Sequence, residues 1–215
     1  MTGRIGGSSS GDHADGGGAT GRGGARGGRV SFAERRERRA QIDDPATILE
    51  AAARFLEPRA RSVTEVRRRL TGAGYRTDLV EGAITRMLEL GMLDDEAFAR
   101  AWVESRDRAR PRGERAIRQE LGLKGVERAT VDLVLNERRE AVAGVPNDDG
   151  STASPDQIAA ERLLARNTRS LARVVDPRQR RQRAYALLAR NGFDPEICRT
   201  VAAMAAEALE LPDVE

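Results

Sequence analysis

The chain has 215 residues, of which 33% are charged and only 3% are aromatic, and its 37 basic residues slightly outnumber its 34 acidic residues. One cysteine and one histidine can build neither a disulfide framework nor a zinc site of Cys and His ligands. No apolar run approaches the roughly 18 residues of a membrane span, and no signal-peptide core is present. We therefore expect a soluble protein of a reducing compartment that does not contact membranes.

Residues 1–43 are predicted to form a disordered tail. Twelve of the 22 glycines fall in the first 29 residues, mixed with serine and arginine. Such a stretch buries too little apolar surface to offset the loss of chain entropy on folding. Its last part, residues 31–41, has the composition of a weak, highly charged helix or of a solvated lead-in, and both interpretations stay open.

From residue 44 onward the composition predicts helices, because Ala, Leu, Arg and Glu dominate and runs of β-branched residues are absent. Four cap residues mark helix starts, either before a proline or three residues before Glu or Gln: Asp44, Ser62, Ser154 and Asp176. Asp94 can also cap the helix that begins DDEAFARAW. The predicted helices span residues 45–57, 62–72, 77–90, 94–109, 113–123, 127–142, 155–170, 177–190 and 195–210.

A short motif, Leu-x-x-x-Gly followed by an apolar residue, occurs three times in this region. Glycine ends a helix well because it adopts the left-handed conformation, and the apolar residue after it then packs against the leucine. The motif therefore predicts the end of the middle helix in each of three similar units. Its copies are Leu70–Gly74–Tyr75, Leu121–Gly125–Val126 and Leu188–Gly192–Phe193.

The predicted fold is all-α, with three tandem three-helix repeats. The repeats cover residues 44–93, 94–142 and 155–211, and residues 143–154 form a linker rich in Gly, Pro, Asn, Asp and Ser. Stacked helical repeats share their faces and form an elongated, curved body. Such a body is better suited to holding a partner than to enclosing a small molecule.

Few residues suggest catalysis. The acidic run from Asp94 to Glu96 could hold a metal or act as an acid or base, but it lies at a helix start, where acids favour the helix dipole. Cys198 falls on an apolar helix stripe, which predicts burial. Phe98 and Trp102 are four residues apart, which favours core packing over a partner contact. We predict no catalytic residue, metal site or cofactor.

Basic clusters lie at or just before the middle helix of each repeat. Arginine at this density can neutralise phosphates or meet an acidic protein surface. The alternative is a solvated helix face with i,i+4 partners, such as Glu104 with Arg108 and Glu114 with Arg118. The candidate partner- or DNA-binding residues are Arg67, Arg68, Arg69, Arg106, Arg108, Arg110, Arg112, Arg115, Arg118, Lys124, Arg178, Arg180, Arg181 and Arg183.

The segment 93–126, LDDEAFARAWVESRDRARPRGERAIRQELGLKGV, resembles the central signature of the RecX regulatory protein family. The residues that carry the resemblance are Asp94, Asp95, Phe98, Ala99, Trp102, Val103, Arg106, Gly113, Glu120, Leu121, Lys124, Gly125 and Val126. The upstream VTEVRRRLTGAGY and the downstream LLARNGF are similar to the family's first and third repeats. The resemblance covers about residues 44–210.

The resemblance implies a cytoplasmic, non-enzymatic regulator of the RecA recombinase. Members of the family are built from tandem three-helix repeats and bind the RecA filament on single-stranded DNA. There they inhibit or modulate ATP hydrolysis, strand exchange and SOS induction. We expect a monomer whose partners are the filament and single-stranded DNA, contacted directly or through the filament. The tail and the linker depart from the family pattern.

Two other functions stay open. Residues 63–93 also fit a helix-turn-helix DNA-binding regulator, whose wing would bring β-strands after Leu93. The second alternative is a helical protein–protein scaffold unrelated to recombination.

Overall fold

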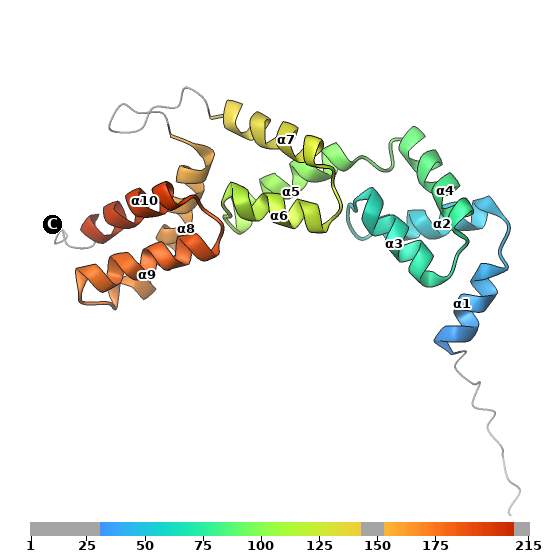
Figure 1. Ribbon diagram of the computed structural model, residues 1–215, viewed down its shortest axis with the longest axis horizontal. Helices are drawn as coiled ribbons and strands as arrows, with labels where there is room; N and C mark the ends of the chain where they lie inside the picture. The colour runs from blue at the N-terminus through green and yellow to red at the C-terminus, as the bar shows by residue number, and fades with distance from the viewer. Residues whose placement is uncertain (1–30, 143–152, 209–215) are drawn as a thin grey trace, which may run out of the picture. The chain divides into compact units, whose positions relative to one another are not determined.

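The computed structural model describes residues 31–142 and 153–208, and all the regular elements in these two ranges are α-helices, as expected (Figure 1). They are α1 (Phe32–Ala40), α2 (Pro45–Leu56), α3 (Val63–Ala73), α4 (Thr77–Glu89), α5 (Asp95–Ala109), α6 (Glu114–Leu123), α7 (Arg128–Glu140), α8 (Pro155–Ala172), α9 (Pro177–Arg190) and α10 (Pro195–Ala208). The predictions for residues 1–30, 143–152 and 209–211 fall outside the described residues.

Helices α2–α10 begin and end within two residues of the predicted positions. The predicted caps explain this agreement. Asp44, Asp94, Ser154 and Asp176 each accept backbone N–H bonds at a helix start. Ser62 accepts from the Glu65 backbone at 3.1 Å, and the Glu65 carboxylate accepts from the Ser62 backbone at 3.3 Å, which completes the capping box.

Of the two interpretations left open for residues 31–41, the structure has the helix, because residues 32–40 form α1 within the predicted tail of residues 1–43. None of the residues of α1 is buried, so it lacks the apolar stripe that would have identified it. Tertiary contacts hold it instead. Arg39 Nη1 donates to the Ala73 carbonyl oxygen at 3.4 Å, and the Arg39 guanidinium lies 5.7 Å from the centre of the Tyr75 ring. Helix α1 thus docks on the end of α3.

The three predicted glycine helix ends are confirmed. Gly74, Gly125 and Gly192 have φ values of 103°, 77° and 81°, which is the left-handed region. The residue after each glycine donates its backbone N–H to the carbonyl oxygen of the leucine of the motif, as in a Schellman turn. These bonds join Tyr75 to Leu70 at 3.3 Å, Val126 to Leu121 at 3.1 Å and Phe193 to Leu188 at 3.4 Å.

A fourth turn of the same kind ends α4 and was not predicted. Gly91 has a φ of 65°, and the Met92 backbone N–H donates to the Met87 carbonyl oxygen at 2.9 Å. Met87 stands where the other three copies have leucine, and it is fully buried as they nearly are. The motif therefore accepts methionine as well as leucine at this position.

Buried apolar side chains form three separate clusters, one in each set of three helices. The set α2–α4 buries Ile48, Val66 and Met87; the set α5–α7 buries Ile117, Leu121 and Leu135; and the set α8–α10 buries Leu188, Cys198 and Val201. The predicted burial of Cys198 is confirmed. Each set therefore has its own small core.

Candidate functional site

Two of the three arginines in the cluster at 67–69 have partners within the first set of helices. Arg67 donates to both carboxylate oxygens of Glu81, from Nε at 2.6 Å and from Nη2 at 2.9 Å. The guanidinium of Arg69 lies 5.7 Å from the centre of the Phe55 ring. Arg68 is exposed, and its only described hydrogen bond is a long one. This cluster mainly holds α3 against its neighbours.

Trp102 is the centre of a charged network in the second set. Trp102 Nε1 and Arg106 Nε both donate to Glu120 Oε2, at 2.8 and 2.6 Å. The Arg106 guanidinium and Lys124 Nζ lie 4.3 and 5.0 Å from the centre of the indole ring. Trp102 also packs against the core of its set, so the core prediction is confirmed. Arg106 and Lys124 are therefore occupied by structural contacts.

The i,i+4 pairs predicted in the middle basic cluster are present. Arg108 pairs with Glu104, and Arg118 pairs with Glu114 at 2.9 Å. Arg118 also donates to Asp132, and this contact raises the pKa of Arg118. These two arginines are neutralised by their own helix or by its neighbour in the set.

Arg112 contacts the third set of helices. Its Nη1 donates to Asn191 Oδ1 at 2.7 Å, in the turn that ends α9. By contrast, Arg110 and Arg115 are exposed, and neither has an ion pair with any residue that the structure describes. Of the middle cluster, they are the two cations that remain available to a partner.

Arg180 was expected on the surface of α9, but only 8% of it is exposed. It donates to the carbonyl oxygens of Val174 at 3.1 Å, Val175 at 3.3 Å and Ala206 at 3.3 Å. These bonds connect α9 to the loop before it and to the end of α10. The neighbouring candidates of this cluster, Arg178, Arg181 and Arg183, are exposed.

The start of α3 meets the glycine turn of the next set. Ser62 Oγ donates to the Lys124 carbonyl oxygen at 2.6 Å, and Thr64 Oγ1 donates to the Gly125 carbonyl oxygen at 3.2 Å. The Val63 backbone N–H donates to Asp95 Oδ1 at 2.8 Å. Asp95, in the first turn of α5, thus satisfies a free N–H of a helix in the preceding set.

The start of α6 meets the third set in the same way. The Gly113 backbone N–H donates to the Asn191 carbonyl oxygen at 3.0 Å, and the Glu114 N–H donates to Asp156 Oδ2 at 2.9 Å. A Cβ atom on Gly113 would lie 2.3 Å from the Gly192 oxygen, so this approach requires glycine. Burial raises the pKa of Asp156, and hydrogen bonds from Glu114 and Arg138 offset this only in part.

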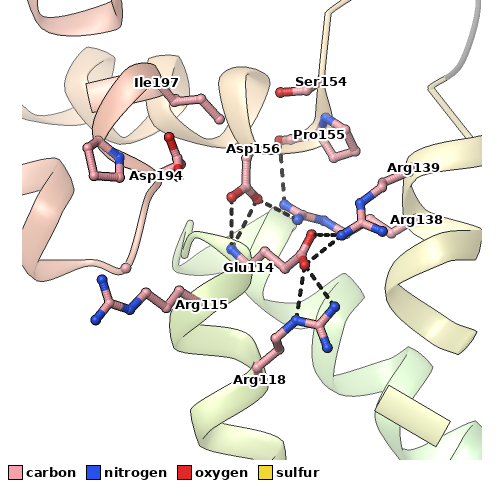
Figure 2. A pocket seen from close by; sticks show the side chains of 12 residues that line it. Glu114, Arg115, Arg118, Arg138, Arg139, Ser154, Pro155, Asp156, Asp194 and Ile197 are labelled. Carbon is pink, nitrogen blue, oxygen red and sulfur yellow. Dashed lines mark hydrogen bonds and ion pairs between the residues drawn. The ribbon is translucent and has the colours of Figure 1, made fainter. Parts of the chain in front are cut away.

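A cavity of about 460 Å³ lies between the second and third sets, and Figure 2 shows the ion pairs at its wall. Arg138 donates to Asp107 from Nη2 at 2.8 Å and to Asp156 from Nη1 at 2.6 Å. Only 8% of the Arg138 side chain is exposed. Arg115 also lines the cavity and makes no bond to the other residues drawn.

The junction between the first two sets yields a stability prediction. Burial tends to raise the pKa of Glu65, but hydrogen bonds from Lys124 Nζ at 2.7 Å and from the Ser62 backbone bring that pKa below its ordinary value. We expect Lys124→Gln to lower the free energy of unfolding at pH 7 by about 1 kcal/mol. A carboxyl with a depressed pKa stabilises the fold above its unfolded-state pKa, and this stabilisation is lost as the pH falls. In urea unfolding the difference between the two proteins should therefore shrink below about pH 4, where only the contact of Lys124 with the Trp102 ring is left to separate them. A difference that stays constant from pH 7 to below about pH 4 would contradict the assignment.

Comparisons with known proteins identify this arrangement. Residues 49–87 match the family description "RecX, first three-helix domain", and residues 94–135 match "RecX, second three-helix domain". Regulatory protein RecX of Mycobacterium avium (strain 104) is 31% identical over 156 residues, which cover 72% of this chain and 83% of that protein. The chain belongs to the RecX family.

A further RecX sequence and a solved RecX structure are also similar to this chain. Regulatory protein RecX of Streptomyces lividans is 32% identical over 145 residues, which cover 66% of this chain and 70% of that protein. The crystal structure of RecX from Lactobacillus salivarius has the same fold, with a TM-score of 0.61 at 17% identity over 76% of this chain and 97% of that one. RecX proteins are regulatory proteins. Within the described residues, no group of three or more His, Cys, Asp or Glu could hold a metal, and no helix could span a membrane.

The junction contacts of the two aspartates, Asp95 and Asp156, were not predicted for this RecX chain. Asp94 caps its own helix, as predicted, but Asp95 caps α3 of the preceding set. A usable signal was present in the sequence. Helices α5 and α8 carry an acid in the first turn at Asp95 and Asp156, whereas the first turn of α2, which follows no other set, has none.

Proposed function

We propose that this RecX-family chain binds the RecA recombinase filament on single-stranded DNA and lowers its ATP hydrolysis, strand exchange and SOS-inducing activity. It would act in the cytoplasm, as a monomer. The observation that carries the proposal is a tandem series of three-helix sets, two of which match RecX domains. Its relatives bear the name "Regulatory protein RecX".

The proposal assigns different roles to the arginines. Those with partners, such as Arg67, Arg106 and Arg138, hold the helices and sets in register. The exposed ones supply positive charge to filament acids or DNA phosphates. A series of similar sets can contact neighbouring subunits of a repeating polymer, so one molecule can alter filament growth with few contacts to each subunit.

The decisive test is the DNA-dependent ATPase activity of the cognate recombinase with this protein added below stoichiometry. Strong inhibition is expected, because one molecule at a filament end or in its groove affects many subunits. A rate that falls only in proportion to added protein would indicate simple sequestration. No inhibition, together with no binding to assembled filaments, would support a scaffold unrelated to recombination.

A charge-reversal variant tests the free arginines of the second set. Arg110→Glu with Arg115→Glu is expected to raise the half-inhibitory concentration about tenfold, equivalent to about 1.4 kcal/mol of binding free energy. The circular dichroism spectrum should stay unchanged, because neither side chain has an ion pair in the described part of the chain. Arg112 is left intact because it binds Asn191.

The matched control is Arg162→Glu with Arg169→Glu, which makes the same charge change on exposed positions of α8. The control should inhibit like the unchanged protein. Equal inhibition curves for both double variants would contradict the role of Arg110 and Arg115.

The alternative of a helix-turn-helix regulator is not favoured. A wing would require strands after Leu93, but the structure has the Asp94-capped helix α5 there. Sequence-specific footprints on duplex DNA would revive this alternative.

A further inference from the structure

A groove of about 410 Å³ between α9 and α10 brings three arginines and a tyrosine together. Arg178, Arg181 and Tyr185 line it from α9, and Arg199 lines it from α10. The positions on α9 are three and seven residues apart, so they follow one helix face over about 10 Å. Alanines of α10 form part of the wall, and their small side chains leave room beside the tyrosine.

The three arginines of this groove, Arg178, Arg181 and Arg199, are exposed and have no ion-pair partner among the described residues. Helix α9 contains five arginines and no acid, and residues 153–208 contain ten arginines and six acids. On α10, Glu196 lies one turn before Arg199 without forming an ion pair with it. The groove is therefore a local concentration of uncompensated positive charge.

The chemistry of the groove favours one ligand class. Guanidinium groups bind phosphate oxygens in a bidentate manner, and a tyrosine ring can stack against a base. Stacking requires a base that is not already paired in a duplex. An acidic protein segment would satisfy the arginines but would make no use of the tyrosine ring beyond its packing on the core.

We infer that the α9–α10 groove binds single-stranded nucleic acid, with backbone phosphates on Arg178, Arg181 and Arg199 and one base stacked on Tyr185. The inference deepens the proposed function, on which it rests, because it assigns the direct DNA contact to the third set of helices. Under this assignment, Arg110 and Arg115 of the second set contact the recombinase.

The test measures fluorescence anisotropy of a labelled oligothymidylate with the full chain, without recombinase. The groove variant combines Arg178→Gln, Arg181→Gln and Arg199→Gln. We expect it to bind at least about tenfold more weakly at low salt. The slope of log affinity against log salt should be shallower by about 2, since each lost phosphate contact on a single strand removes about 0.7.

The matched control combines Arg162→Gln, Arg169→Gln and Arg190→Gln, three exposed arginines of the same set outside the groove. It removes the same charge and should keep the affinity and the salt slope of the unchanged chain. An equal loss in the groove variant and the control would overturn the inference, because binding would then depend only on net charge.

A second pair of variants tests the ring. Tyr185→Phe keeps the aromatic face and should bind normally, whereas Tyr185→Leu should bind roughly 5- to 100-fold more weakly. Circular dichroism and thermal unfolding identify any folding defect, since Tyr185 also packs on the core. Equal affinities for these two variants in their folded state would overturn the stacking role.

Two further outcomes separate this inference from the proposed function. A groove variant that binds oligothymidylate normally but fails to bind recombinase filaments would make the groove a protein-docking surface and overturn the inference. A full chain that binds DNA through the groove but leaves the recombinase ATPase unchanged would overturn the proposed function alone.

Discussion

Replacing Arg138 with methionine is expected to lower the free energy of unfolding by about 3–5 kcal/mol at pH 7. Arg138 is the common partner of Asp107 and Asp156, and 8% of its side chain is exposed. Methionine keeps most of the volume but leaves two carboxylates without their cation in a largely buried place. Urea unfolding followed by circular dichroism measures the loss.

The neighbouring residue provides the control. Arg139 also forms an ion pair, with Glu114 at 2.5 Å, but 48% of its side chain is exposed. Arg139→Met should therefore cost no more than about 1 kcal/mol. If the two variants lose the same stability, the buried ion pairs do not hold the junction of the second and third sets.

The loss in Arg138→Met should shrink in acid. Burial already raises the pKa of Asp156, and removing Arg138 removes a group that lowers it. A carboxyl whose pKa is higher in the folded state than in the unfolded state destabilises the fold at neutral pH. That penalty disappears as the pH falls through the folded-state pKa, because the folded protein takes up the proton first. A loss that is constant from pH 7 to about pH 4 would contradict this account.

Gly192→Ala is expected to destabilise the protein by about 3 kcal/mol. The left-handed φ of 81° accounts for about 1–2 kcal/mol of this for a residue with a Cβ atom. The added Cβ would also lie 2.6 Å from the backbone nitrogen of Ala116, so α6 would have to move away from the turn. The free energy of unfolding from urea titration gives the effect.

Gly91→Ala separates these two causes. Gly91 has a similar φ of 65°, but a Cβ there would meet nothing within 4 Å. This variant should therefore show only the conformational cost, about 1–2 kcal/mol. Equal losses at Gly91 and Gly192 would mean that the close approach of the third set to α6 contributes nothing to stability.

The helices could be predicted because their ends depend on neighbouring residues in the sequence. The caps at Asp44, Asp94 and Asp176 and the left-handed turns at Gly125 and Gly192 involve residues within five positions of one another. Helix α1 was left open because its stability comes from contacts with α3 and not from an apolar stripe of its own.

The surface could not be predicted to the same extent. The clusters at 106–118 and 178–183 look alike in sequence, but pairing depends on residues far along the chain. Arg112 donates a hydrogen bond to Asn191, and Arg180 donates one to the Ala206 carbonyl oxygen. The density of arginine therefore identified the basic regions and the i,i+4 spacing identified two local pairs, Glu104 with Arg108 and Glu114 with Arg118, while the long-range partners of the other arginines came only from the structure.

The aspartates at the two junctions also determine when the helix starts they cap can be completed during synthesis. Helix α3 is translated before Asp95, and α6 is translated before Asp156. The amides of Val63 and Glu114 therefore stay hydrated until these aspartates have been synthesised. The first and second sets of helices thus each acquire a backbone partner from the set that emerges after them. A nascent chain that stalls between two sets would expose an unfinished helix start to the quality-control machinery.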